Sequence, residues 1–551
     1  MKRATLLLLF AQLAILGFAQ TTLSYKFGMD TSSQTLSVHF QFTGTDSGKT
    51  YLQFPGTFAN QEKLYRAIAS VAIQTKGAVL HTTGDSAIRY ITHKPNQKLE
   101  LVYTLKQDWR GPFTYPKNFR AVIQKQYMQL TGSALLVVPK MDSTQFVQVR
   151  LDWSRFPKNW KIYNSLHADS RTFEGSLSLE KFQSTYYTAG DFRGYRVLIN
   201  NRPVYVAIRA NNWKFADTAM VAKIKTIIGM ERNFWNDHSE PYYFVSLIPF
   251  DGEGSYNGTA MHQSFMLTMS QDHSIGIPVL SLLAHEYFHR WNGITISLKG
   301  SEFENKWFSE GFTEYYTYKL LYTSQMISLA DYVRSINEHI SDYYLSPVRN
   351  EDNHTLSKNY WSTRAYNHLP YKKGFVYALY IDQLIQKESS SRYSLDNIMF
   401  DLVHAHNNKQ ELTSELILTL VEKYAGKNIQ KLHEDVIIKG ATVPVAEQSL
   451  GQHVSYKVQS LGAFDIGFDL EASWKAKAIT GLKENSEAWQ AGIRNGQKLK
   501  GYSINYDNIY QLAEISIEEN GAIQKINYYP MSAQKQEVPQ FFLKEPQSNT
   551  N

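Results

Sequence analysis

The segment AHEYFHRWNG, from Ala284 to Gly293, contains the pattern His-Glu-x-x-His. His285 and His289 are four residues apart, so in a helix both imidazoles project from one face and can reach one metal ion. Glu286 sits beside a candidate ligand, where it can reach a water on the metal without binding the metal itself. A general base needs this position. The pattern therefore predicts part of a catalytic metal site.

The surrounding sequence IPVLSLLAHEYFHRWNG has the marks of a buried helix. Pro278 suits the first turn of such a helix, and Gly293 suits its end. The alternative is an ordinary helix that contains two histidines and a glutamate by chance. The helical context and a suitable third ligand both argue against this alternative.

A catalytic zinc site with two histidines requires a third protein ligand. NKWFSEGFTEYYTYKLLY, residues 305–322, is predicted to be a second helix, and its Glu310 is the candidate ligand. A His₂Glu set leaves one position for water, whose pKa zinc lowers towards neutrality. Glu314 lies one turn after Glu310 and could orient His285 by accepting its other ring N–H, or it could be a solvated carboxylate. We therefore expect one Zn²⁺ per chain.

The remaining histidines that stand out give no comparable signal. His433, in KLHEDVIIK, is followed by a glutamate but by no second histidine at the right spacing, and it is predicted to lie on the surface. His404 and His406 are predicted to be solvated or helix-capping residues.

Composition places the chain among globular proteins. Its 551 residues suggest about three domains, and 43% hydrophobic with 19% charged residues excludes a disordered chain. The formal net charge of +7 is mild, and no dense Lys/Arg run is present, so nucleic-acid binding is not expected. The chain has no cysteine. Any metal must therefore be held by histidines and carboxylates.

The N-terminus has the features of a secretory signal peptide. Lys2 and Arg3 precede an apolar run at residues 6–16, and Gly17-Phe18-Ala19 forms a small-x-small cleavage site. A membrane anchor is the alternative, but the run is shorter than the roughly 20 apolar residues that a span needs. We expect residues 1–19 to be removed, leaving no integral membrane segment and an exported, periplasmic or secreted protein.

The hydrophobic pattern changes twice along the chain. From residue 20 to 192 it has period two, which predicts antiparallel strands in an N-terminal β-sandwich. Three runs show the alternation: Leu36, Val38, Phe40 and Phe42; Leu99, Leu101, Tyr103 and Leu105; and Val147, Val149, Leu151 and Trp153.

Helices and strands then mix within residues 193–445, the predicted catalytic domain. A helix is expected over 216–235, a strand over 242–250, and mostly helices from Pro278 onward. Thr413 can cap one of these helices and Gly426 can end it. Strands return in a final unit at 446–545.

Three motifs resemble the glycyl aminopeptidase family: HEYFHRWNG, then WFSEGFTEYY, then LPYKKGFVYALYIDQL. The resemblance extends from about Thr185 to Ile398. These proteins are gluzincin zinc metallopeptidases with a thermolysin-like catalytic domain, and many carry a C-terminal PDZ domain. The resemblance implies His285, His289 and Glu310 as zinc ligands and Glu286 as the base, in agreement with the spacing. It adds Tyr371 as a hydrogen-bond donor to the oxyanion; spacing alone predicts only an aromatic residue flanking a helix.

The chain departs from the family pattern upstream of the zinc helix. The family usually has Gly-x-x-Glu-His there, and its Glu binds the free amino group of the substrate. The matching segment here begins with Gly258 and includes His262, but Met261 stands where Glu is expected. A thioether cannot pair with an ammonium ion. Endopeptidase activity on the same scaffold is therefore an alternative to aminopeptidase activity, and Glu253 is a candidate substitute anchor.

The final unit resembles a PDZ domain. IGFDL (466–470) could form its carboxylate-binding loop and strand, and NSEAWQAGIRNGQKL (485–499) its helix and turn. Such a groove could bind an extended peptide, or the unit could only pack against the catalytic domain. Together these features predict a three-domain α+β zinc metallopeptidase that acts on a peptide or protein. A third possibility is a peptide-binding protein whose zinc site is vestigial.

Overall fold

The computed structural model describes residues 21–167, 170–209, 212–252, 254–447, 450–451, 453–506, 508–519 and 521–544. The predicted signal peptide and Glu253 lie outside these ranges. The chain forms two compact units. The first comprises Met1–Gly229 and Asp237–Gly276, and the second comprises Met230–Asn236 and Ile277–Asn551. The predicted domain boundaries at 192/193 and 445/446 fall inside these units. No helix of the described ranges is long and apolar enough to cross a membrane.

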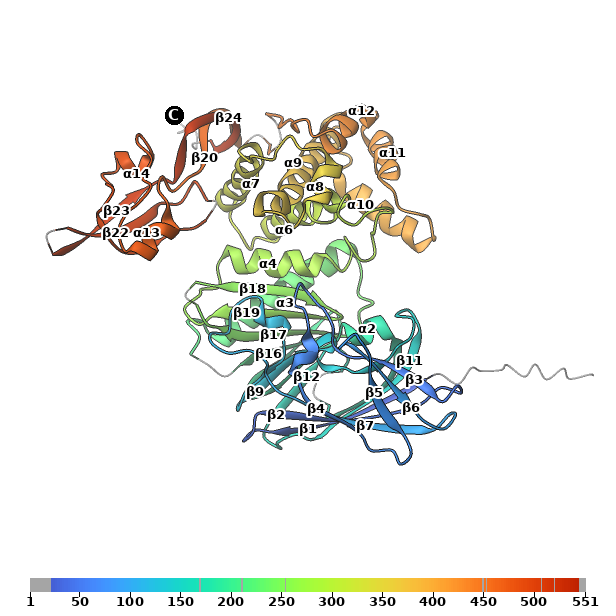
Figure 1. The fold of residues 1–551 in the computed structure, drawn as a ribbon. Helices are drawn as coiled ribbons and strands as arrows, with labels where there is room; N and C mark the ends of the chain where they lie inside the picture. The colour runs from blue at the N-terminus through green and yellow to red at the C-terminus, as the bar shows by residue number, and fades with distance from the viewer. Residues whose placement is uncertain are drawn as a thin grey trace, which may run out of the picture. The chain divides into compact units, whose positions relative to one another are not determined.

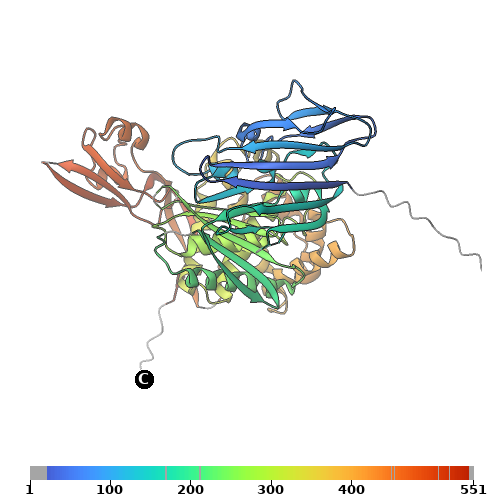
Figure 2. The same ribbon diagram turned by 90° about the horizontal axis from the view of Figure 1, so that it is seen from below.

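Most of the first unit consists of β-sheets. The largest has six strands in the order β13 (Thr172–Ser178), β11 (Phe146–Arg155), β1 (Thr22–Asp30), β2 (Thr35–Thr43), β7 (Lys98–Leu105) and β4 (Ile68–Ile73). Its blue and teal strands lie side by side in Figure 2. The predicted alternation is confirmed, because the alternating apolar residues predicted for β2, β7 and β11 are all buried. The prediction of antiparallel pairing was wrong at one place, since β1 and β11 run parallel.

Two smaller sheets complete this β-rich region. One has the order β10 (Val138–Pro139), β3 (Lys49–Gln53), β6 (Ile88–Thr92) and β5 (Val79–Thr82). The other has the order β12 (Lys161–Asn164), β14 (Tyr186–Gly190), β9 (Tyr127–Thr131) and β8 (Val122–Ile123). Short helices α1 (Gly132–Leu135) and α2 (Leu179–Gln183) lie in the connections.

A five-stranded mixed sheet follows in the same unit. Its order is β15 (Phe192–Ile199), β16 (Arg202–Arg209), β17 (Tyr243–Phe250), β19 (Ser264–Ser270) and β18 (Tyr256–Met261). The three inner strands run parallel. Nearly every residue of β17 and β19 is buried, as expected for central parallel strands. The helix expected over 216–235 is α3 (Asp217–Trp235), whose last turn belongs to the second unit.

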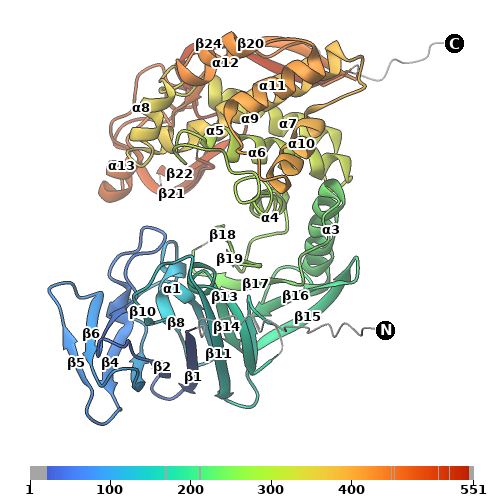
Figure 3. The same ribbon diagram turned by 90° about the vertical axis from the view of Figure 1, so that its right-hand side faces the viewer.

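The second unit begins with a helical region, coloured green to orange in Figures 1 and 3. It contains α4 (Ile277–Phe288), α5 (Lys306–Ser309), α6 (Gly311–Thr323), α7 (Leu329–Tyr344), α8 (Asn353–Lys358), α9 (Arg364–Glu388), α10 (Leu395–Asn407), α11 (Ser414–Ala425) and α12 (Gln430–His433). Helix α9 packs against α5, α6, α7 and α11. The predicted cap of α11 is confirmed: the Thr413 side chain accepts a hydrogen bond from the Leu416 N–H, and Gly426 ends the helix at φ +63°.

Helices α6 and α9 approach closely at two glycines. A Cβ atom on Gly311 would lie 2.3 Å from Gly374 Cα, and one on Gly374 would lie 1.9 Å from the Trp307 carbonyl oxygen. No other residue type fits either position without moving a helix. Because Gly311 follows Glu310 and Gly374 lies one turn after Tyr371, this contact brings the elements that carry two predicted site residues together.

The chain ends in a smaller β-rich module. Strands β20 (Val454–Phe464) and β24 (Met531–Leu543) pair antiparallel, and β21 (Lys498–Ser503), β22 (Ala513–Glu519) and β23 (Ala522–Tyr528) form a separate sheet. Helices α13 (Leu470–Ala476) and α14 (Glu487–Gln490) connect them. We call residues 453–544 the C-terminal module. Its strand β24 packs on α7 within the same unit.

Candidate metal centre

The two histidines of the His-Glu-x-x-His pattern lie on one face at the end of α4. His285 is buried in the helix, and the His289 N–H donates to the His285 carbonyl at 3.3 Å, one turn later. The chain then turns at Gly293, whose φ is +116°. A Cβ on Gly293 would lie 3.3 Å from His289 Nδ1, so glycine leaves room for the ring.

Glu310 completes a group of three converging ligand atoms. Its Oε2 lies 3.1 Å from His289 Nε2 and 3.3 Å from His285 Nε2, and the two Nε2 atoms are 3.0 Å apart. Ligands at 2.0–2.1 Å from a tetrahedral zinc ion are separated by about 3.3 Å. Within the ranges that the structure describes, no other such group is found. The donor types and spacing therefore fit a divalent metal such as zinc.

The element that carries Glu310 differs from the prediction. One continuous helix over 305–322 was expected, whereas α5 ends at Ser309 and α6 begins at Gly311, with Glu310 between them. The Glu310 N–H still donates to the Lys306 carbonyl at 3.0 Å, so the break is slight. The break between α5 and α6 lies at the point where Gly311 packs against Gly374 of α9.

Lys306 holds the other oxygen of Glu310. Its Nζ lies 2.8 Å from Glu310 Oε1, which leaves Oε2 directed at the two histidines. Burial opposes ionisation of Glu310, but His289 and His285 outweigh it and hold its pKa well below the usual range. Lys306 was not among the predicted site residues, although a lysine four residues from a helical glutamate is a recognisable pair.

Each histidine uses Nδ1 for the protein, which leaves Nε2 for a metal. His285 Nδ1 lies 2.8 Å from Glu314 Oε2, and His289 Nδ1 lies 2.9 Å from the Asn292 carbonyl oxygen. Such contacts fix the tautomer and the orientation of a metal ligand. Glu314 thus makes the contact that its predicted orienting role requires.

Glu314 also contacts a second histidine that sequence reasoning did not find. His339 Nε2 lies 2.8 Å from Glu314 Oε1, and His339 Nδ1 lies 2.7 Å from the Ser335 carbonyl oxygen. Both partners are acceptors, so both contacts are hydrogen bonds only when each ring nitrogen carries a proton. His339 is buried and stacks on Phe375 at 4.2 Å between ring centroids. It has no motif, so no sequence signal marks it.

Burial disfavours a charged imidazole at His285, but the Glu310 and Glu314 carboxylates outweigh it and raise the pKa of His285 to about 10. Protons therefore compete with a metal for this ring, and metal affinity should increase with pH. Burial likewise opposes ionisation of Glu314, but hydrogen bonds from His285 and His339 hold its pKa well below the usual range.

Tyr371 lies beside the metal group, inside α9 and not at its flank. Its ring stacks against His285, with 6.0 Å between centroids. Burial and then the Glu310 carboxylate raise the pKa of its hydroxyl well above the usual value, so the hydroxyl keeps its proton and can donate. The Glu286 charge also acts on Tyr371, and the Glu286 side chain is only partly buried on α4. Glu286, the predicted base, and Tyr371, the predicted hydrogen-bond donor, are thus close enough to interact electrostatically.

Residues 278–378 match the model of the M61 glycyl aminopeptidase family. The resemblance to the glycyl aminopeptidases is confirmed. The matched segment carries all three members of the metal group, together with Glu286 and Tyr371. The family is one of peptidases, and the match covers residues in the helical region of the second unit. No curated protein sequence matches the chain.

The chain also resembles solved structures. One is an aminopeptidase N family protein from Idiomarina loihiensis, with a TM-score of 0.69 and 15% identity over 95% of this chain and 98% of that one. Two are structures of yeast LTA4 hydrolase, one in complex with bestatin. Both have a TM-score of 0.46, with 15% and 14% identity, over 78% of this chain and 68% and 69% of theirs. The first similarity shows a shared multidomain α+β fold.

A pocket of about 320 Å³ adjoins the metal group in the segment that matches the family model. His289 and Glu310 form part of its wall. Ile294, Ile296 and Leu298 supply apolar surface, and Ile294 is 72% exposed. The pocket offers space for a substrate residue next to two of the three candidate metal ligands.

The predicted amine-binding segment belongs to the first unit. Gly258 and Met261 lie on the edge strand β18, where Met261 pairs with Ser264, and His262 begins the turn to β19. Met261 packs against a core that includes Phe113 and Met266. The substrate-binding role predicted for these residues stays a prediction.

The prediction of a surface position for His433 was wrong. The residue is buried, and its Nδ1 lies 3.1 Å from the Tyr377 hydroxyl. Its ring also packs edge-on against Trp307, with 5.2 Å between centroids. The sequence around it looks polar because the helix exposes its other face. His404 and His406 are exposed in the last turn of α10, as predicted.

Proposed function

We propose that the protein is a zinc metallopeptidase that hydrolyses peptide bonds. The observation that carries the proposal is the convergence of His285 Nε2, His289 Nε2 and Glu310 Oε2 within 3.0–3.3 Å of one another. These atoms would hold the zinc. When bound, zinc would lower the pKa of a water molecule and polarise the carbonyl of the scissile bond.

The residues of the chain would perform the proton transfers and position the substrate. Glu286 would accept a proton at its carboxylate and deliver it to the leaving amine. Tyr371 would donate a hydrogen bond to the carbonyl oxygen as that oxygen gains negative charge. A substrate residue would occupy the pocket beside Glu310. Lys306 would keep the second oxygen of Glu310 engaged throughout.

Glu286→Gln tests whether Glu286 acts as the base, without a change in the shape of its side chain. The amide keeps the shape of the side chain but cannot act as a base, so turnover should fall by at least about 10²-fold with zinc and fold retained. His285→Ala should lose both zinc and activity, and His404→Ala, an exposed histidine, serves as the matched control. Zinc content is measured by elemental analysis and turnover on mixed peptides. A fully active preparation without a transition metal would remove the central proposal.

Met261 favours a second candidate function, endopeptidase activity on the same scaffold. Without a carboxylate at this position, the protein should discriminate weakly between free and N-acetylated substrates, since an unpaired buried ammonium costs several kcal/mol. Met261→Glu should increase the preference for free amines. Gln263→Glu, which adds the same charge two residues away, is the control. A parent that already prefers free amines a hundredfold has another anchor and is an aminopeptidase.

Two further features remain proposals from the sequence. Export to the periplasm or medium is supported by the pattern of residues 1–19 and is tested by N-terminal sequencing of the mature protein. PDZ-like peptide binding by the C-terminal module is supported by IGFDL and the helix-turn sequence at 485–499. A peptide-binding protein with a vestigial zinc site would bind peptides but hydrolyse none after zinc is added.

A further inference from the structure

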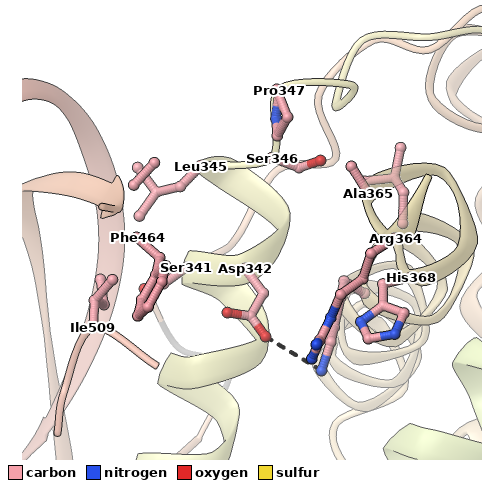
Figure 4. A pocket seen from close by; sticks show the side chains of 13 residues that line it. Ser341, Asp342, Leu345, Ser346, Pro347, Arg364, Ala365, His368, Phe464 and Ile509 are labelled. Atoms are coloured by element: carbon pink, nitrogen blue, oxygen red, sulfur yellow. Dashed lines mark ion pairs between the residues drawn. The ribbon is translucent and has the colours of Figure 1, made fainter. Parts of the chain in front are cut away.

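One turn of α7, residues 337–341, is bonded on two sides. It carries His339, whose Nε2 lies 2.8 Å from Glu314 Oε1 beside the candidate metal centre. It also contacts the C-terminal module, because β24 packs on α7. In Figure 4, the module residues Phe464 and Ile509 lie next to α7. This turn therefore connects the module to the residue that bridges two histidines.

The first bonds between the turn and the module join Asn337 to the backbone of β24. The Asn337 side chain donates to the Phe541 carbonyl at 2.7 Å and accepts from the Phe541 N–H at 2.8 Å. Hydrogen bonds are directional, so two bonds from one amide to one residue fix both the distance and the orientation of α7 on β24.

A closed ring of hydrogen bonds continues the contact at the end of the turn. The Tyr510 hydroxyl donates to Gln540 Oε1 at 2.7 Å, the Gln540 amide donates to the Ser341 hydroxyl at 3.0 Å, and the Ser341 hydroxyl bonds to the Tyr510 hydroxyl. Ser341 and Gln540 are buried. The Asn508 amide adds a bond to Glu338 at 3.3 Å. A buried polar network whose members are satisfied holds its elements rigidly.

His339 projects from the other side of the same turn. Successive helical residues are about 100° apart, so His339 lies about 200° from both Asn337 and Ser341. A shift of the turn by about 1 Å away from Glu314 would lengthen the 2.8 Å contact to about 3.8 Å, which is beyond hydrogen-bonding range. The Phe375 ring, stacked at 4.2 Å, also contacts the imidazole, but through atom pairs that are individually weak.

We propose that the C-terminal module positions His339 against Glu314 and thereby supports metal binding at His285. The inference rests on the proposed function, because it requires a metal at that site. Glu314 Oε2 lies 2.8 Å from His285 Nδ1, so a Glu314 side chain fixed by His339 presents a fixed acceptor to the metal ligand. His339 is a positioning residue, since it acts through Glu314. This role of the module does not depend on peptide binding by its IGFDL segment.

A second connection leads from α7 to α9. Asp342 Oδ2 lies 3.3 Å from Lys372 Nζ, which is the dashed ion pair in Figure 4, and Lys372 follows Tyr371. A pocket of about 270 Å³ among α7, α9 and the module leaves this end of α7 less tightly packed. The two connections differ in their readout. The contact through His339 should affect metal affinity, whereas the contact through Lys372 should affect turnover.

The test measures zinc affinity of the full-length protein by competition with a zinc-chelating dye at one fixed pH. Asn337→Ala removes both bonds to Phe541 and should weaken zinc binding by about 3–30-fold, the range in which residues that touch no ligand change coupling between sites. Tyr510→Phe breaks the ring of bonds from the module side and should also weaken zinc binding. Lys498→Ala, which breaks an exposed ion pair with Glu518 inside the module, should leave the affinity unchanged.

His339→Phe separates positioning from a general loosening of the fold. Phenylalanine can keep the stack on Phe375 but loses the bond to Glu314, so zinc binding should weaken by a similar factor. Adding Asn337→Ala to this variant should cause no further loss, because the contact through which the module acts is already broken. The free energy of unfolding of each zinc-free variant is measured in parallel. Lower stability with unchanged zinc affinity would make the contact with the module purely structural.

Three results would overturn the inference. Parental zinc affinity in folded Asn337→Ala and Tyr510→Phe variants would show that the module does not act on the metal site. An undiminished further loss when Asn337→Ala is added to His339→Phe would exclude His339 as the connection. A parent that binds no zinc would overturn the proposed function as well, whereas the first two results leave that function intact. If Asn337→Ala does not fold, Tyr510→Phe provides the same comparison in the parent and in His339→Phe.

Discussion

Replacing Glu314 tests whether a residue that would not touch the metal nevertheless sets the metal affinity. Its Oε2 accepts the hydrogen bond from His285 Nδ1 at 2.8 Å, and that contact holds a proton on Nδ1 and directs Nε2 at the metal position. In Glu314→Ala, the buried Nδ1–H loses its partner, and the ring is free to adopt the other tautomer. Glu314→Gln keeps an acceptor oxygen for His285 but removes the charge.

Two independent estimates give the expected loss of zinc affinity in Glu314→Ala. A hydrogen bond to a charged group contributes about 1.5–3 kcal/mol, which corresponds to about 10–100-fold in a dissociation constant. Outer partners of metal-ligating histidines are worth 10–100-fold in affinity by mutation. We therefore expect Glu314→Ala to weaken zinc binding by about 10–100-fold. Glu314→Gln should lose less than about tenfold.

The affinity is measured by competition with a zinc-chelating dye at one fixed pH, because zinc and protons compete for His285. Glu314→Ala also removes the carboxylate partner of the buried His339, so the free energy of unfolding of each zinc-free variant is measured in parallel. Glu422→Ala, an exposed glutamate on α11, is the control for loss of a carboxylate.

A folded Glu314→Ala variant whose zinc affinity stays within twofold of the parent would refute the reasoning. The contact with His285 would then be incidental. Equal losses in Glu314→Ala and Glu314→Gln would mean that the negative charge, and not the fixed tautomer, determines the affinity.

Three further predictions concern the same unit. Tyr371→Phe should lower kcat by roughly 10²–10³-fold with little change in KM, and an effect on KM alone would make Tyr371 a substrate-binding residue. Gly374→Ala should lower the free energy of unfolding by about 1–3 kcal/mol, because the new Cβ would lie 1.9 Å from the Trp307 carbonyl oxygen. The change is measured by denaturant unfolding. Unchanged stability would show that α6 and α9 can move apart without cost. Burial lowers the pKa of His433 from 6.5 to about 4, so the folded protein binds fewer protons between these values and loses up to about 3 kcal/mol of stability as pH falls from 6.5 to 4. His433→Gln should flatten this loss while keeping a partner for Tyr377, and an identical pH profile would exclude His433 as its source.

The candidate metal group was predictable from the sequence because its chemistry depends on local spacing. The spacing of four positions from His285 to His289 places two imidazoles on one helical face whatever surrounds the helix. The alternating residues of β2, β7 and β11 were equally informative, since a period of two buries one face of a strand in any sheet. The cap residues of α11 also act within a single turn. Each of these signals is contained in a few consecutive residues.

Contacts between distant segments needed the tertiary structure. His339 reaches Glu314 from 25 positions away, and Lys306 became significant only once Glu310 was seen to direct its other oxygen at the histidines. The parallel pairing of β1 with β11 and the burial of His433 were mispredicted for the same reason. Periodicity reports which face of an element is apolar, but not which element covers it.

The sequence by itself determined which residues could bind a metal, where most strands and helices form, and that Met261 breaks the family pattern. Only the tertiary structure decided that Gly311 and Gly374 bring α6 against α9, that Glu314 bridges two histidines, and that the C-terminal module is bonded to the turn of α7 that carries His339. Backbone propensity and side-chain spacing act over a few residues. Packing, burial and the pKa shifts that follow from burial depend on atoms hundreds of residues apart, which no local pattern records.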